Sequence, residues 1–281
     1  MRIQPLLIVL PLAVLLANCS AVLNSRSPAP STSAESPVAA NTPFRYDSYA
    51  QVLEQYVDEQ GLVDYVGLQA DADGLKRFNQ SIGAVPSATY EAWSDAEKMA
   101  FLINAYNSFT LESIIDQNPL KASIRDIPGV WRVRRFQVAG QSKTLDDIEH
   151  NTLRPTFQDP RIHAALNCTA ISCPVLRQEP YTAEKLDAQL EEQVRLWLAS
   201  PQGLQIDRAN NQVRISQLFD WFGEDWLPNY GTSEGFTGND KQRAALNFIS
   251  QYVSEDDRAY LQQGEYELSY LDYDWTLNRQ S

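Results

Sequence analysis

The stretch that decides the fold is Ser94-Asp-Ala-Glu-Lys-Met-Ala-Phe-Leu-Ile-Asn-Ala-Tyr-Asn-Ser-Phe-Thr-Leu-Glu-Ser-Ile-Ile-Asp-Gln117. Ser94 and Glu97 have the spacing of a capping box, which begins a helix. Asn118-Pro119 ends it, because the residue before a proline disfavours helical geometry. Between these signals the side chains are apolar on nearly every face. We therefore expect a helix buried in the core.

Two asparagines interrupt this apolar helix. Asn104 and Asn107 are three residues apart, so they share one face. A buried amide without a partner costs about 1–3 kcal/mol. We therefore expect at least one of the two to be buried and bonded to the backbone of residues 145–175. In a second role, either amide is a candidate donor to a developing oxyanion.

The rest of the chain predicts a helix-dominant α+β fold with small antiparallel β pieces. Apolar side chains recur at helical spacing over 46–57, 70–83, 87–93, 145–153, 184–198, 216–226, 241–253 and 256–263. Short alternating stretches predict hairpins within 131–145 and 204–215 and a closing strand at 266–270. Strands and helices do not alternate regularly, which argues against a Rossmann or barrel fold.

The first residues are typical of an export signal. A short basic start is followed by an apolar run from Pro5 to Ala17, too short for a membrane span. Leu16-Ala-Asn-Cys19 resembles the lipobox of bacterial lipoproteins, although Asn18 departs from the usual small residue. We expect a signal peptide at 1–18 and a protein held at the bacterial cell envelope by lipid on Cys19. The alternative is ordinary cleavage after Ala21, giving a soluble periplasmic or extracellular protein.

Composition limits the organisation and the partners. Residues 19–43 are rich in Ser, Pro and Ala and predict a flexible tether, which leaves 44–281 as a single globular domain. The formal net charge of −13 argues against a nucleic-acid partner and against attraction to anionic lipid. Membrane contact is therefore expected only through the N-terminal lipid.

The predicted chemical centre is Arg161-Ile-His-Ala-Ala-Leu-Asn-Cys-Thr-Ala-Ile-Ser-Cys-Pro-Val-Leu-Arg177. The chain has three cysteines and two histidines, and this segment holds Cys168, Cys173 and His163. His150 lies shortly before it. Cysteine and histidine are the side chains most easily tuned for chemistry near neutral pH.

Four motifs together resemble the bacterial and plant family called domain of unknown function 547. They are Phe101-Leu-Ile-Asn-Ala-Tyr-Asn107, Leu145-Asp-Asp-Ile-Glu-His150, Ala165-Leu-Asn-Cys-Thr-Ala-Ile-Ser-Cys-Pro174 and Tyr273-Asp-Trp275. The resemblance spans about residues 90–275. It implies candidate positions and no reaction. The domain association of some members with redox proteins points towards thiol chemistry.

The leading hypothesis is a cysteine-dependent hydrolase or acyltransferase with Cys168 as nucleophile. His150 is the expected base, with Asp146 on its face of the helix, or Glu149, as the orienting carboxylate. Pro174 restricts the backbone of Cys173, which makes Cys173 the less favoured nucleophile. His163 is a second candidate base. Both histidines precede Cys168, so the fold would be a distant, permuted papain- or transglutaminase-like arrangement.

Three alternatives stay open. Cys168 and Cys173 could form a disulfide, either structural in a non-catalytic binding or assembly module, or active in thiol–disulfide redox chemistry. The two cysteines and two histidines could hold zinc, but their spacing is not a standard one, so no metal and no cofactor is expected. The thiols could also pack as small apolar groups with no chemistry.

Overall fold

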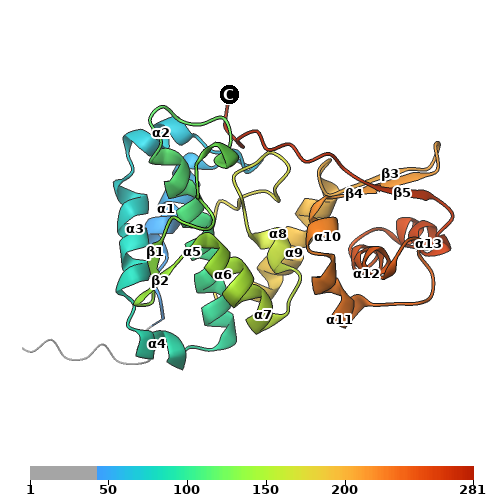
Figure 1. Cartoon of the computed structure of the whole chain (residues 1–281), viewed down its shortest axis with the longest axis horizontal. Helices are drawn as coiled ribbons and strands as arrows, with labels where there is room; N and C mark the ends of the chain where they lie inside the picture. Colours follow the sequence, from blue (N-terminus) through green and yellow to red (C-terminus); the bar gives the residue numbers. More distant parts are fainter. Residues whose placement is uncertain (1–42) are drawn as a thin grey trace, which may run out of the picture. The chain divides into compact units, whose positions relative to one another are not determined.

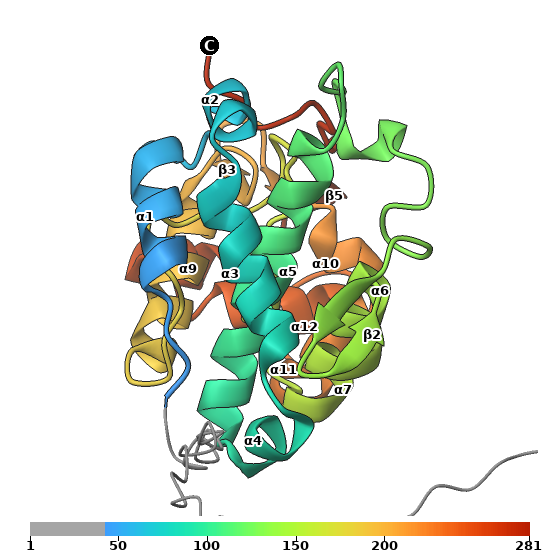
Figure 2. The same cartoon turned by 90° about the vertical axis from the view of Figure 1, so that its left-hand side faces the viewer.

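Helix α5 (Asp95–Ile115) is the central helix of the first half of the fold, with α3 (Asp73–Ala84) packed beside it and α1 (Asp47–Tyr56) packed on α3 (Figures 1 and 2). The computed structural model describes residues 43–281. The predicted signal peptide, Cys19 and nearly all of the predicted tether lie outside these residues. The described part is a helix-dominant α+β fold, as the sequence predicts.

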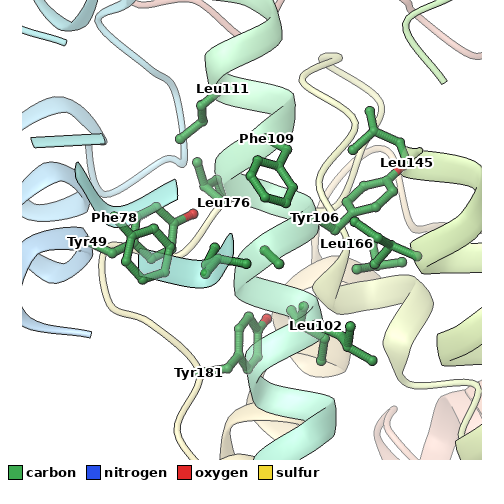
Figure 3. Packing of buried hydrophobic residues seen from close by; sticks show 14 of the residues in the cluster. Tyr49, Phe78, Leu102, Tyr106, Phe109, Leu111, Leu145, Leu166, Leu176 and Tyr181 are labelled. Atoms are coloured by element: carbon green, nitrogen blue, oxygen red, sulfur yellow. The ribbon is translucent and has the colours of Figure 1, made fainter. Parts of the chain in front are cut away.

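The capping box and the apolar faces that the sequence predicts are both present in helix α5. The Ser94 hydroxyl accepts from the Glu97 amide, and the Glu97 carboxylate accepts from the Ser94 amide at 2.8 Å, which completes the capping box. The helix is buried on almost all sides. Figure 3 shows Leu102, Tyr106, Phe109 and Leu111 of α5 in one apolar cluster. The other labelled members come from elsewhere in the chain and are Tyr49, Phe78, Leu145, Leu166, Leu176 and Tyr181.

Most of the other helices lie in the predicted ranges, but α2 (Tyr65–Ala70), α8 (Ile162–Ala165) and a 3-10 turn at Ile124–Asp126 were not predicted, and two predicted helices are divided. The longer ones in the predicted ranges are α9 (Leu186–Ala199), α12 (Asp240–Ile249) and α13 (Glu255–Gln263), and a shorter one is α4 (Ser87–Ala92). The predicted helix 145–153 divides into α6 (Leu145–Ile148) and a π-helical turn (Glu149–Leu153), followed by α7 (Arg154–Phe157). The predicted helix 216–226 divides into α10 (Leu218–Trp221) and a 3-10 turn (Gly223–Trp226), followed by α11 (Leu227–Tyr230).

The strands form two small sheets. β1 (Phe136–Val138) and β2 (Gln141–Lys143) make an antiparallel hairpin, and β3 (Leu204–Asp207) pairs antiparallel with β4 (Gln212–Ile215). The closing strand β5 (Glu267–Tyr270) is parallel to β4, so the three-stranded sheet is mixed, beside the antiparallel pairs that the sequence predicts. The reason is the connection, since α10 to α13 carry the chain back before it enters β5.

The apolar side chains form two clusters within one compact unit. The first surrounds α5, and the second lies between α9, α12 and the three-stranded sheet, around Trp197, Phe219, Trp226 and Phe248. Residues 271–281 lead from β5 back to the first cluster, where Leu277 is buried. Ala170 forms a β-bridge with Leu277, so this segment runs beside the one that holds the cysteines.

None of the helices within residues 43–281 has both the length and the apolar character needed to cross a bilayer.

Candidate functional site

A pocket of about 640 Å³ is lined by side chains from both apolar clusters and from the segments between them. Its charged and sulfur-bearing residues are Arg125, Arg132, Asp146, Glu149, His150, His163, Cys168 and Cys173. Most of the remaining lining is aromatic or aliphatic: Tyr106, Ile127, Val130, Trp131, Leu166, Leu218, Trp221, Phe222, Tyr273 and Trp275. Six of the eight residues predicted for the chemical site thus share one cavity wall.

The two cysteines of the pocket are joined as a disulfide. Cys168 is partly exposed, whereas Cys173 is only 7% exposed. The loop between them is shaped by Asn167, whose carboxamide oxygen accepts from the Thr169 amide at 2.9 Å and whose nitrogen donates to the Pro174 carbonyl at 2.8 Å. In this form Cys168 is therefore not the free thiol that the nucleophile hypothesis requires. The disulfide hypotheses fit the arrangement.

Tyr273 lies against both sulfurs. Its hydroxyl oxygen is 3.1 Å from the Sγ of Cys168 and 3.1 Å from the Sγ of Cys173. Burial raises the pKa of Tyr273 well above its ordinary value, so the hydroxyl keeps its proton at neutral pH. A disulfide sulfur carries no hydrogen, and the tyrosine is therefore the donor. The amide of Cys168 also points at the Cys173 Sγ, at 2.9 Å.

His163 is buried and pairs with the partly buried Asp225. Its Nε2 is 2.7 Å from Asp225 Oδ2, and the ring stacks on Phe222 with centroids 4.4 Å apart. Arg154 donates to the same carboxylate through two nitrogens, at 2.6 and 2.9 Å. Burial alone would raise the pKa of Asp225, but the hydrogen bonds from His163 and Arg154 hold that pKa well below its ordinary range. Asp225 is therefore ionised and its charge is shared by two donors.

His150 is held by Arg154. The guanidinium can only donate, so His150 Nδ1, 3.1 Å from Arg154 Nη1, must accept. Asp146 and Glu149 come within 3.9 and 3.8 Å of the ring nitrogens, which is beyond hydrogen-bond range. The residue that orients His150 is thus Arg154, and not Asp146 or Glu149 as the sequence predicts.

Glu149 is a buried carboxylate that opens onto the pocket. The residue is 8% exposed, and within residues 43–281 no Lys or Arg forms an ion pair with it. Tyr106 faces it from α5. Burial raises the pKa of Tyr106 well above its ordinary value, and the negative charge of Glu149 raises it further. Glu149 therefore has a protonated tyrosine beside it but no Lys or Arg within ion-pair distance among residues 43–281, and the Arg154 guanidinium attracts it only from farther away.

Asn104 and Asn107 are not brought to the pocket. Asn107 donates to the Ala165 carbonyl at 2.9 Å and accepts from the Asn167 amide at 2.8 Å, which fixes the backbone just before Cys168. Asn104 exchanges the same two bonds with the backbone of Tyr181, at 2.7 and 3.0 Å. The prediction of a buried amide bonded into 145–175 is confirmed by Asn107. Neither asparagine lines the cavity, so the structure gives no support to the oxyanion role.

An aromatic wall, defined as Trp131, Trp221, Tyr273 and Trp275, covers another part of the pocket. Trp221 and Trp275 stack with centroids 5.8 Å apart, and Tyr273 and Trp131 lie 4.6 and 6.1 Å from Trp275. Trp221 is 44% exposed, which is unusual for so large an apolar side chain.

Sequence reasoning missed several of these residues. Tyr273 and Trp275 belong to the last of the four motifs, so that motif was the available signal. Asp225 and Arg154 carry no local pattern that distinguishes them from surface charges. Within residues 43–281 no group of Cys, His, Asp and Glu is placed to hold a metal ion, and both candidate thiolate ligands are tied in the disulfide.

Residues 90–198 match the family model described as Protein of unknown function, DUF547. No curated protein and no solved structure matches the chain. The matched segment holds α5, both histidines, the Asp146–Glu149 region and the disulfide. Asp225 and the aromatic residues at 221, 273 and 275 lie beyond it. The resemblance thus covers one part of the pocket, and the papain- or transglutaminase-like arrangement stays a prediction.

Proposed function

We propose that the pocket carries out thiol–disulfide exchange at the Cys168–Cys173 bond. The observation that supports this most directly is the position of the disulfide, which forms part of the wall of a 640 Å³ cavity with a tyrosine hydroxyl 3.1 Å from each sulfur. A bond that serves only to close a loop has no need of a cavity large enough for a small molecule.

The asymmetry of the two sulfurs sets the direction of attack. An incoming thiolate bonds to the partly exposed Sγ of Cys168, the bond between the two cysteines breaks, and Cys173 leaves as a thiolate. The Cys168 amide and the Tyr273 hydroxyl both point at the departing sulfur and stabilise its charge. A second thiol then attacks the mixed disulfide and releases a small disulfide, so two thiols are oxidised and the cysteine pair is reduced. The reverse reaction reduces a substrate disulfide.

His163 supplies a proton acceptor in the same pocket. Its Nε2 donates to the ionised Asp225, which leaves Nδ1 without a hydrogen-bond partner among the residues that the structure describes. An imidazole held in this tautomer can take the proton of an incoming thiol. His150 is less suited, because Arg154 already occupies its Nδ1.

The His163–Asp225 pair also favours a second candidate, the cysteine-dependent hydrolase or acyltransferase. Once the disulfide is reduced, Cys168 would be the nucleophile and His163, oriented by Asp225, the base. In this role the disulfide is an inactive resting form. The third possibility, a non-catalytic binding or assembly module, requires the disulfide to stay closed.

The same proposal includes export and a lipid anchor at Cys19. Oxidising compartments outside the cytosol permit cysteine pairs to cycle between dithiol and disulfide. Mass spectrometry of the mature N-terminus tests the anchor, with lipidated Cys19 as the expected form. An unmodified N-terminus at residue 22 would contradict it.

The exchange activity is tested on the native protein without denaturant. 2-Mercaptoethanol is added, and free thiols are trapped with an alkylating reagent and counted by mass. We expect reduction within minutes, slowed about tenfold in Tyr273→Phe, since one lost hydrogen bond to a developing thiolate is worth about 1.4 kcal/mol. Tyr260→Phe is the matched control, because its hydroxyl bonds to Asn211, away from the pocket.

Two results would contradict thiol–disulfide exchange and favour one of the other two functions. A disulfide that reacts only after unfolding would make the bond structural and end the exchange hypothesis. Turnover of a thioester by the reduced protein, with none by the oxidised protein, would favour the acyltransferase.

A further inference from the structure

We infer that the pocket selects small thiols and disulfides that carry a positive charge, with Glu149 and the aromatic wall holding an ammonium group. The inference rests on the proposed exchange reaction, because it names the substrate class of the same disulfide.

Glu149 is the first reason. A buried carboxylate is costly unless a cation or several donors compensate it. Glu149 is 8% exposed and lines the cavity, and the nearest charged partner that the described residues offer is the His150 ring at 3.8 Å. That ring accepts at Nδ1 from Arg154, so it has no proton there to give to Glu149. An ammonium group in the cavity would satisfy the carboxylate.

The aromatic wall is the second reason, and it is independent of the first. Faces of indole and phenol rings attract cations, and clusters of such rings form binding sites for organic ammonium groups. The wall already holds one cation of the chain itself, since the Arg125 guanidinium lies 5.2 Å from the centre of the Trp275 ring. The half-exposed Trp221 offers a further ring at the same wall.

The paired cations in and beside the pocket attract an anionic ligand only weakly. Arg132 is paired with Asp146 at 3.0 Å, and its side chain is 85% exposed. Arg154 is engaged by Asp225, and the proton of His163 Nε2 is directed at that same carboxylate. Arg125 also forms no ion pair within residues 43–281, but it is exposed and lies over the Trp275 ring, so Glu149 is the unpaired charge that is buried in the cavity wall.

The test compares three disulfides that differ mainly in their end groups. Cystamine carries two ammonium groups, hydroxyethyl disulfide is neutral, and dithiodipropionate is anionic. Each is mixed with the pre-reduced protein at fixed ionic strength, and the rate is divided by the rate with an unstructured cysteine peptide. We expect cystamine to exceed the neutral compound at least tenfold after this correction, and the anionic compound to be slowest.

Glu149→Gln should reduce the cystamine preference to less than threefold. Glu255→Gln removes an exposed carboxylate on α13, away from the pocket, and should leave the preference unchanged. A fourth measurement needs no exchange chemistry: tetramethylammonium chloride should change the tryptophan fluorescence of the oxidised protein in a saturable way, and this change should be lost in Glu149→Gln.

The outcomes separate the two proposals. Equal corrected rates for all three disulfides, or the fastest rate for the anionic one, would overturn the charge selection and leave the exchange activity standing. No exchange with any disulfide, together with saturable tetramethylammonium binding that needs Glu149, would end the exchange activity and keep the cation site. Failure of both measurements would overturn both.

Discussion

Two sets of buried polar groups in the molecule differ in whether their hydrogen bonds and charges have partners. On α5, Asn104 and Asn107 have both ends of each amide bonded to the backbone of distant segments. Around the pocket, Glu149 lacks a counter-ion and His163 keeps one nitrogen free within the described residues. Satisfied polar groups fix a fold, whereas unsatisfied ones at a cavity are free to meet a ligand. The difference predicts that removing the first kind costs stability and removing the second kind costs binding or chemistry.

The largest loss of stability is expected for Asn107→Leu. The change leaves the Ala165 carbonyl and the Asn167 amide buried without partners, at about 1–3 kcal/mol each, so the free energy of unfolding should fall by about 2–6 kcal/mol. Denaturant unfolding measures this. The control Asn151→Leu removes an exposed amide and should change stability by less than about 1 kcal/mol. A small effect of Asn107→Leu would contradict the claim that the fully bonded amides of α5 stabilise the fold.

Asp225→Asn is expected to cost about 2–3 kcal/mol at pH 7, since Arg154 and His163 lose a shared, partly buried carboxylate. The pKa of Asp225 is lowered in the folded protein, so its contribution is present above the ordinary pKa of aspartate, about 4, and disappears as pH falls below it. The gap in unfolding free energy between wild type and variant should therefore narrow from pH 6 to pH 3. Asp220→Asn, an exposed change nearby, should show no such narrowing.

Cys168→Ser and Cys173→Ser should each lower stability by about 2 kcal/mol, the loop-entropy value for a bridge over so few residues. The double variant should lose no more than either single one, because one bond is broken in all three. Thermal unfolding in oxidising buffer measures the losses. Additive losses would mean that the two side chains act independently and not as a disulfide.

Glu149→Gln should have the smallest effect on folding, within about 0.5 kcal/mol of wild type, since no Lys or Arg of the described chain is left unpaired. Its effect should appear in ligand selectivity instead. If Glu149→Gln lowered the free energy of unfolding by several kcal/mol, Glu149 would stabilise the fold as the asparagines of α5 do. The difference between the two sets of polar groups would then not hold.

How far the sequence could predict this structure depended on whether a signal was local. The capping box and the apolar run were sufficient to predict α5. Asn104 and Asn107 could be identified because they are polar residues in an otherwise apolar helix. The division of 145–153 at the π-helical turn was not predictable, because its periodicity differs little from that of a straight helix. The parallel pairing of β5 with β4 depends on a long return connection and has no local pattern.

The site shows the same limit. Cys168, Cys173, His150 and His163 could be grouped by their rarity, and the pocket contains all four. Asp225 and Arg154 could not be found, since they are ordinary charged residues until the fold brings them together. The orienting partner of His150 was assigned by helical spacing to Asp146, whereas a residue four positions on the other side holds the ring.

The late position of Tyr273 in the chain has a consequence for biosynthesis. Ribosomes add residues in order, and Tyr273 follows Cys173 by 100 residues. The segment 271–281 docks beside Ala170 only after α9 to α13 and β5 have been made. The two thiols therefore leave the ribosome, and can meet an oxidant, before the aromatic wall of the pocket is complete. Formation of the disulfide therefore does not require the tail, whereas the contact of Tyr273 with both sulfurs does.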